Sequence, residues 1–203
     1  MVKVKICGIT NPEDALMSVE AGADALGFVF FQGSSRFISP AQATAIICRL
    51  PPFVPTVGLF VNEELATVNA VADQCRLDIV QLHGGESPDY CHAIRRRIIK
   101  AFRVKDAASL DLVVEYHVAG ILLDAWSPAA HGGTGMTFNW DIAARAAVSR
   151  PLILAGGLTP ENVAEAVVTV RPYAVDVSSG VESAPGKKDA GLVSRFIRAT
   201  RSK

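Results

Sequence analysis

The order of elements in this sequence predicts an α/β fold, a single (β/α)8 barrel of the TIM type that spans residues 1–203. Three observations predict it. Short, β-rich apolar runs recur eight times, helix-start signals lie between them, and successive runs end 20 to 31 residues apart. Strict alternation at such regular spacing is what a closed barrel of eight parallel strands requires. An open, doubly wound sheet is the alternative, because alternation alone does not distinguish the two, but eight units without a second domain favour closure.

The predicted strands are apolar almost without interruption, which is typical of parallel strands buried on both faces. Strands with one face in water would alternate polar and apolar residues instead. The eight strands are predicted at residues 2–7, 25–31, 56–61, 79–83, 98–104, 120–124, 152–155 and 174–178.

The eight predicted helices are marked mainly by polar residues that cap a helix N-terminus. In four cases proline follows the cap and suits the first helical position, where no backbone N–H is needed. These pairs are Asn11-Pro12, Ser39-Pro40, Ser87-Pro88 and Thr159-Pro160. Aspartates mark three more helices, namely Asp106 before residues 109–116, Asp141 near the start of a helix that reaches Val148, and Asp189 before residues 192–199.

Composition excludes several classes of protein. Half of the 203 residues are hydrophobic, and 20 Lys plus Arg balance 20 Asp plus Glu. A net charge of zero argues against nucleic acid or an anionic membrane as a partner. No apolar run approaches the roughly 20 residues that span a bilayer, and no charged-then-apolar leader follows Met1. We therefore expect a cytoplasmic protein, and a monomer, because no long apolar stripe stands out.

The four cysteines indicate a reducing compartment rather than a disulfide scaffold. None belongs to a C-x-x-C metal or redox motif. Cys48, Cys75 and Cys91 fall in predicted helices, where we expect small buried side chains. Cys7 differs, because it ends the first predicted strand and is followed by Gly8 and a helix start.

Polar residues and glycines gather where the predicted strands end. In barrels of this kind the active site lies at the carboxyl ends of the strands, so residues that are distant in sequence share one rim. The rim residues are Cys7, Arg36, Gln81, His83, Asp124, Gly156, Gly157, Asp176, Ser178, Ser179 and Gly180.

The turns after strands seven and eight predict a phosphate site. Gly156 and Gly157 lie between a strand and a helix, and Ser178-Ser179-Gly180 follows Asp176 one unit later. Glycines let backbone N–H groups converge on an anion, hydroxyl groups add donors, and a nearby helix N-terminus adds a favourable dipole. Glycines that only turn the chain are the alternative, but two such turns in consecutive units favour phosphate.

Cys7 and Asp124 are candidates for a base and an acid. A free thiol has a pKa near ~8.5, which a helix N-terminus lowers; on residue type alone, Cys7 is explained equally well as a small core residue. Asp124 ends an otherwise apolar run. It is either a cap for the next loop or a functional acid, and we favour the acid, because apolar surroundings favour a protonated carboxyl group. Because they end strands one and six, Cys7 and Asp124 are expected to face each other across the mouth of the barrel.

The remaining rim residues are predicted to contact substrate. The planar guanidinium of Arg36 suits a substrate carboxylate, although an ordinary surface arginine is the alternative. Gln81 and His83 are predicted to bind substrate, against the alternative of a rim histidine held by hydrogen bonds. His131 and the glycines after it, in the long interval that follows Asp124, predict a flap over the site.

These motifs resemble those of the phosphoribosylanthranilate isomerase family, which acts in tryptophan biosynthesis. The resemblance covers the whole chain in order, and one departure is Ser35, where many members carry proline. The matching segments are KICGIT at 5–10, SSR at 34–36, QLHG at 81–84, LD at 123–124, HGGTG at 131–135, AGGL at 155–158, DVSSGVE at 176–182 and GKKD at 186–189.

The resemblance implies an Amadori rearrangement, in which phosphoribosylanthranilate, an aminoaldose, becomes the aminoketose carboxyphenylamino-deoxyribulose phosphate. Asp124 would be the acid that opens the furanose ring, and Cys7, as thiolate, the base that removes the proton of the second sugar carbon. Arg36 would hold the anthranilate carboxylate, and the glycine-rich turns would hold the phosphate. The imine nitrogen is the electron sink, so the resemblance implies no metal and no organic cofactor.

Two other functions stay open at this point. The related isomerase of histidine biosynthesis performs the same rearrangement on a substrate with two phosphates, but that family resembles a doubled barrel with an aspartate at the end of strand one. Here strand one ends in Cys7, and only the second half carries glycine-rich turns. A catalytically silent phosphate-binding barrel is the other alternative, against which Cys7 and Asp124 argue.

Overall fold

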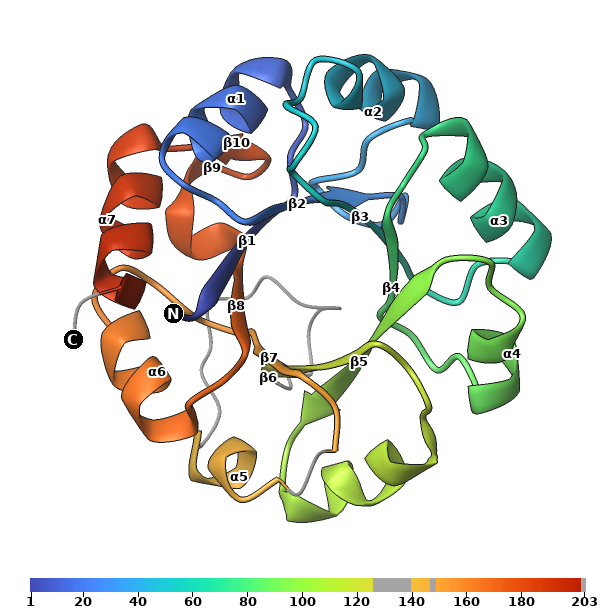
Figure 1. Ribbon diagram of the computed structural model, residues 1–203, viewed down its shortest axis with the longest axis vertical. Coiled ribbons are helices and arrows are strands. Elements are labelled where there is room, and N and C mark those ends of the chain that lie inside the picture. The colour runs from blue at the N-terminus through green and yellow to red at the C-terminus, as the bar shows by residue number, and fades with distance from the viewer. Residues whose placement is uncertain (126–139, 147–148, 202–203) are drawn as a thin grey trace.

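Eight parallel strands close into a barrel at the centre of the molecule (Figure 1). The computed structural model describes residues 1–125, 140–146 and 149–201. Each strand pairs with the next one in the chain, and β8 pairs with β1 to close the ring. This closed order confirms the predicted barrel and excludes the open sheet. The strands are β1 Lys3–Cys7, β2 Ala25–Val29, β3 Thr56–Phe60, β4 Ile79–Leu82, β5 Arg97–Val104, β6 Gly120–Ala125, β7 Leu152–Leu154 and β8 Ala174–Val177.

All eight predicted strands are present, but five of them end earlier than predicted. Residues assigned to strand ends from the sequence, among them His83, Ala155 and Ser178, lie just past the paired ladder and line a cavity there. The sequence pattern cannot show this difference, because the apolar run continues smoothly from the ladder into the wall of the cavity.

Helices surround the barrel on its outer side (Figure 1). In the described part of the chain they are α1 Pro12–Glu20, α2 Pro40–Ile47, α3 Leu65–Gln74, α4 Pro88–His92, the 3-10 helix η1 Ala107–Glu115, α5 Trp140–Ala144, α6 Val163–Val170 and α7 Ala190–Arg201. A short 3-10 turn, η2 Ser179–Val181, leads into a two-stranded hairpin of β9 Glu182–Ala184 and β10 Lys187–Lys188, which the sequence did not predict.

Three of the four predicted polar-proline caps are confirmed. The side chains of Asn11, Ser39 and Ser87 each accept a backbone N–H of the first helical turn. At Thr159 the predicted helix start is wrong, because α6 begins only after Asn162, although the Thr159 side chain does accept the Glu161 N–H at 3.3 Å. The Asn162 side chain accepts from the Thr159 N–H at 2.8 Å and donates to a carbonyl of the preceding turn, and these bonds hold the segment as a turn.

The aspartate caps have mixed outcomes. Asp106 does cap a helix, but η1 has 3-10 rather than α geometry. Asp141 lies in the first turn of α5, which ends at Ala144 rather than at Val148; Val148 lies outside the described residues. The Asp189 side chain accepts the Leu192 N–H at 2.8 Å, so it begins α7 as predicted.

Two apolar layers hold the barrel. The larger packs the outer faces of the strands against the helices and contains Phe28, Phe60 and Phe196. The smaller fills the barrel interior with the side chains of Ile99, Ala101, Leu122, Ile153, Ala155 and Ala174. The prediction for the helical cysteines holds for two of them: Cys75 and Cys91 are buried, whereas Cys48 follows the last turn of α2 and is exposed.

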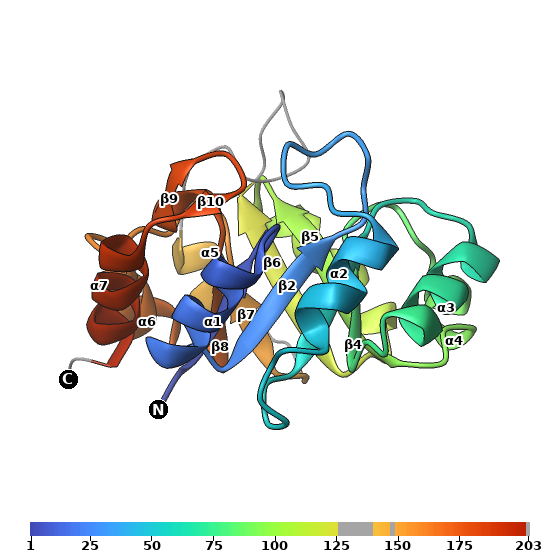
Figure 2. The same ribbon diagram turned by 90° about the horizontal axis from the view of Figure 1, so that it is seen from above.

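Strand β1 shows how alternation selects the residues that face inward. Val4 and Ile6 join the outer layer, while Lys5 and Cys7, two residues apart, share the opposite face of the strand. A lysine therefore enters the barrel interior beneath the thiol. In the view of Figure 2 the carboxyl ends of the strands point upward, toward the loop after β2 and the β9–β10 hairpin.

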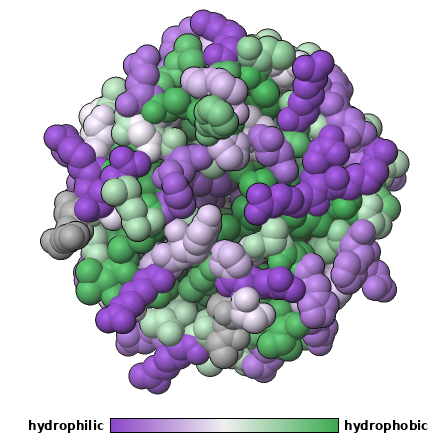
Figure 3. Space-filling model, viewed as in Figure 1, coloured by the Kyte–Doolittle hydropathy of each residue, from purple (hydrophilic) through white to green (hydrophobic). Residues whose placement is uncertain are grey.

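Hydrophilic side chains surround the face seen in Figure 3, with hydrophobic ones between them. Among the described residues, no helix combines the length and the apolar character that crossing a bilayer requires.

Candidate active site

A cavity at the carboxyl ends of the strands collects most of the predicted site residues. Five strands of the barrel and the loop after β2 contribute them. The predicted residues that line it are Cys7, Arg36, Gln81, His83, Asp124, Gly156, Gly157, Asp176 and Ser178. Ser179 and Gly180 lie in η2, directly after Ser178, and are not among the residues that line the cavity.

On one side of the cavity a buried ion pair lies beside Cys7. Lys5 Nζ lies 2.9 Å from Asp176 Oδ1, joining neighbouring strands β1 and β8. Because Gly27 on β2 has no side chain, the Cys7 thiol and the Lys5 ammonium both fit in the space next to it. A Cβ atom there would lie 2.7 Å from Cys7 Sγ and 3.0 Å from Lys5 Nζ. Lys5 was assigned no role from the sequence. Its position two residues before Cys7 on a strand could have indicated that the two side chains share one face.

Opposing effects act on the thiol. Burial raises the pKa of Cys7, the ammonium of Lys5 lowers it, Asp176 raises it and Lys188 lowers it more weakly. The net pKa of Cys7 is raised, so the cations offset only part of the burial effect. Burial also opposes the charge on Lys5, but Asp176 and Cys7 together more than compensate, and the pKa of Lys5 is raised. Lys5 is therefore a permanent cation.

Arg36 is held by a carboxylate of the β9–β10 hairpin. Its Nε and Nη2 atoms donate to Glu182 at 2.8 and 2.7 Å, which is the two-bond geometry typical of arginine and carboxylate. Lys188 Nζ donates to the same Glu182 at 2.7 Å. Burial would raise the pKa of Glu182, but Arg36 and Lys188 lower it overall. Neither Glu182 nor Lys188 was assigned a role from the sequence.

On the opposite side of the cavity an amide, an imidazole and a carboxyl group are joined. Gln81 Nε2 lies 3.2 Å from His83 Nδ1, and His83 Nε2 lies 3.1 Å from Asp124 Oδ2. All three side chains are buried. The sequence predicted these residues separately, and the structure joins them into one chain.

The two glycine-rich turns lie against each other. Gly156 and Gly157 have φ angles of +83° and +64°, which only glycine adopts readily. A Cβ atom at Gly180 would collide with the Leu158 carbonyl, so the second turn approaches the first closely. Lys188 Nζ lies 3.3 Å from the Ser178 carbonyl, which brings a cation to this wall.

The predicted flap lies outside the described residues. It comprises His131 and the glycines after it. The structure therefore does not bear on that prediction.

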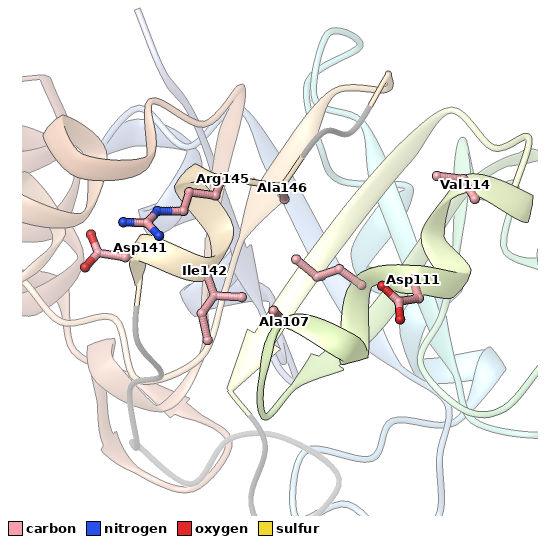
Figure 4. A pocket seen from close by; sticks show the side chains of 8 residues that line it. Ala107, Asp111, Val114, Asp141, Ile142, Arg145 and Ala146 are labelled. Atoms are coloured by element: carbon pink, nitrogen blue, oxygen red, sulfur yellow. The ribbon is translucent and has the colours of Figure 1, made fainter.

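A second groove lies outside the barrel, between η1 and α5 (Figure 4). Ala107, Asp111 and Val114 line it from η1, Asp141 lines it from α5, and Arg145 lines it from the turn directly after α5. It contains none of the predicted site residues. The chemistry of the rim therefore lies in the barrel cavity and not in this groove.

Comparison with known proteins agrees with this geometry. Residues 4–199 match the family model described as N-(5'-phosphoribosyl)anthranilate isomerase. The isomerase of Geobacter sulfurreducens is 67% identical over 99% of both chains, and that of Geobacter metallireducens is 65% identical over all of both.

Solved structures give the same result. The Thermotoga maritima enzyme superposes with a TM-score of 0.92 at 48% identity over 99% of both chains. A related structure, at 47% identity and a TM-score of 0.87 over 99% of both chains, holds reduced 1-(o-carboxyphenylamino)-1-deoxyribulose 5-phosphate. From its barrel, its rim and these relatives, the chain belongs to the N-(5'-phosphoribosyl)anthranilate isomerase family.

Proposed function

We propose that this isomerase uses Asp124 as the general acid and Cys7 as the general base of its rearrangement. One observation carries the proposal: the two side chains come from opposite sides of the barrel, on β6 and β1, and line the same cavity. An acid and a base on opposite walls can act on two different atoms of one bound sugar.

The reaction proceeds in balanced proton steps. Asp124 gives its proton to the furanose ring oxygen as the bond between that oxygen and the first carbon breaks, which leaves a protonated imine. The Cys7 thiolate takes the proton of the second carbon, and the electrons of that bond move toward the imine nitrogen to form an enolamine. Tautomerisation moves a proton to the first carbon and gives the ketone.

Lys5 supports the thiolate form of Cys7. The permanent ammonium of Lys5 shares the space over Gly27 with the Cys7 sulfur and favours its ionised form. Because burial raises the pKa of Cys7 and Asp176 neutralises part of the field of Lys5, that pKa stays raised in the free enzyme. The base is therefore mostly a thiol until the pH rises or a bound substrate changes the local charge.

The substrate is held at its two ends. The glycine-rich turns at Gly156-Gly157 and Ser178 bind the phosphate through backbone N–H groups, with Lys188 behind them. Arg36 binds the anthranilate carboxylate; Glu182 holds its Nε and Nη2 atoms, so the substrate meets the Nη1 edge. Binding energy from both ends positions the reacting carbons between acid and base.

The test is the activity of two isosteric variants. Freshly made phosphoribosylanthranilate is fluorescent, and its consumption is followed without added metal. Cys7→Ser and Asp124→Asn should each lower kcat at least ~100-fold, because one well-placed acid or base contributes that much. Unchanged turnover in either variant would remove that residue from the proposal, and retained binding of the reduced product analogue would show that the site is intact.

The predicted monomer stays a prediction, as does a cytoplasmic location. One solved relative, 46% identical over 99% of both chains with a TM-score of 0.88, consists of monomers generated from the dimeric Thermotoga maritima enzyme. Sedimentation of this chain at micromolar concentration would decide between the two states.

A further inference from the structure

We propose that Gln81 is a positioning residue for the acid, and that its amide fixes the ring proton of His83 on Nε2 so that His83 donates a hydrogen bond to Asp124. This inference rests on the proposed acid role of Asp124. It gives Gln81 and His83 a role in proton placement, in addition to the substrate contact predicted from the sequence.

The geometry makes the three side chains one unit. Gln81 Nε2 to His83 Nδ1 is 3.2 Å, and His83 Nε2 to Asp124 Oδ2 is 3.1 Å. Gln81 is fully buried, His83 is 8% exposed and Asp124 is 5% exposed. Water therefore has little access to these bonds, and each group depends on its protein neighbours for its hydrogen bonds.

The donor and acceptor pattern selects one tautomer of the imidazole. A neutral histidine has one N–H and one bare nitrogen, while an amide nitrogen only donates. With Gln81 Nε2 facing Nδ1, that nitrogen must be the bare one, and the ring proton lies on Nε2. The N–H then points at Asp124 Oδ2, which accepts it.

This tautomer is the one that an acid at Asp124 needs. Because Oδ2 accepts from His83, the acidic proton is carried by Oδ1 and is available to the substrate oxygen. As that proton leaves, negative charge grows on Asp124 and the hydrogen bond from His83 strengthens, so it stabilises the transition state more than the ground state. In the opposite tautomer the carboxyl proton would be donated to bare Nε2 instead.

A second observation concerns the other end of the amide. Gln81 Oε1 is buried and has no hydrogen-bond partner within the part of the chain that the structure describes. Gln81 also lines the cavity. An unpaired buried acceptor at a ligand site fits a donor on the ligand, and an open-chain sugar phosphate offers hydroxyl groups. A substrate hydroxyl on Oε1 would keep Nε2 turned toward His83.

The direct test needs no variant of Gln81. The chain has four histidines, so 15N-histidine labelling gives four imidazole spectra, and His83→Asn identifies the one of interest. We expect the wild-type protein to show a protonated Nε2 and a bare Nδ1 at His83. A protonated Nδ1 with a bare Nε2 would overturn the proposal.

Kinetics test the consequence. Gln81→Met keeps the size of the side chain but cannot donate, so the His83 spectrum should move toward a tautomer mixture and kcat should fall at least ~10-fold, because part of the acid contribution is lost. In an Asp124→Asn background the same substitution should cause no further loss in kcat, since its effect acts through the acid.

The outcomes separate the two proposals. An equal loss of kcat from Gln81→Met in both backgrounds would mean that Gln81 acts independently of Asp124, and it would overturn this inference. Full activity of Asp124→Asn alone would instead overturn the acid assignment. If Gln81→Met does not fold, the wild-type spectrum still decides the tautomer.

Discussion

The wall of the cavity built on β1 and β8 is dense in charge, whereas the wall built on β4 and β6 relies on a neutral amide and imidazole. The charged wall contains the Lys5–Asp176 and Arg36–Glu182 pairs, and Lys188 also pairs with Glu182. A thiol must lose a proton before it can act as a base, and nearby cations favour that loss. This wall therefore suits the base role that we propose for Cys7.

The neutral wall has the opposite task. A general acid must keep its proton until the substrate arrives, and a permanent cation beside it would favour early ionisation. His83 forms a hydrogen bond with Asp124, and Gln81 in turn holds His83, so neither side chain brings a fixed charge to the acid. The difference between the walls teaches that one barrel mouth can separate a proposed acid from a proposed base by the kind of side chain placed beside each.

One cation, Lys100, does lie near the neutral wall, but its ammonium group is bound by other partners. Lys100 and Glu86 form a buried pair at 3.0 Å, and Lys100 Nζ also donates to the Gly84 carbonyl at 2.7 Å. Glu86 in turn accepts from the backbone N–H groups of Asn62 and Gly84. The pair thus braces the segment that carries His83.

The largest expected effect comes from breaking this brace. Lys100→Met leaves Glu86 buried and unpaired, so the free energy of unfolding should fall by about 3–5 kcal/mol, and Tm by about 10 °C. Thermal melts at pH 7 check this. Because Lys100 does not touch the acid chain, kcat of the folded variant should stay near wild type; a large loss of kcat with unchanged Tm would contradict the bracing role.

The same pair predicts a pH dependence of stability. Burial would raise the pKa of Glu86, but Lys100 and the backbone donors lower it overall. A carboxyl group with a lowered folded-state pKa stabilises the protein above its unfolded pKa and loses that contribution as the pH falls. The difference in Tm between wild type and Lys100→Met should therefore shrink below about pH 4.

The next effect tests the charged wall. Lys5→Met removes the cation beside Cys7 while burial and Asp176 remain, so the pKa of Cys7 should rise further. Each pKa unit lowers the thiolate fraction at neutral pH about tenfold. Activity at pH 7 should thus fall at least ~10-fold and recover as the pH is raised. The pH dependence of thiol alkylation measures the shift directly.

Lys3→Met is the matched control, and its expected effect is the smallest of all. Lys3 lies on the same strand as Lys5, but at its amino-terminal end. Its side chain is 53% exposed and pairs with Asp24. Alkylation of Cys7 and turnover should match wild type. If the pH dependence of Cys7 alkylation in Lys5→Met matched that in Lys3→Met, Lys5 would have no role in ionising the thiol.

A smaller effect than that of Lys5→Met is expected at the hairpin. Glu182→Gln keeps the size of the side chain but weakens its hold on Arg36 and Lys188, so the arginine loses its preset geometry. KM should rise about fivefold with kcat nearly unchanged, because the part of the substrate that we propose Arg36 binds does not react. Steady-state kinetics decide this, and a drop in kcat at constant KM would contradict the assignment of Arg36.

The fold was predictable because its signals are local and repeat eight times. Buried apolar runs, polar caps and regular spacing fall within short windows of sequence, so both the order of the strands and the barrel follow from them. The error at Thr159 has the same origin, because a cap followed by proline is also a turn signal, and only the contacts of Asn162 decide which forms.

The sequence indicated which residues line the candidate site, but not which of them contact one another. Cys7 and Asp124 stand out by residue type at strand ends, whereas the partners of Arg36 and Cys7 depend on distance in space. Glu182 comes from a hairpin 146 residues away, and Asp176 reaches Lys5 over 171 residues. Sequence spacing carries no information about such contacts until the barrel closes.

The most direct test of the division between the walls is a substrate deuterated at the second sugar carbon. In Cys7→Ser, removal of that proton should limit the rate, so kcat should show a large primary isotope effect. In Asp124→Asn, ring opening should limit the rate and the isotope effect should be suppressed. An isotope effect that is large in Asp124→Asn and suppressed in Cys7→Ser would contradict the assignment of acid and base to their walls.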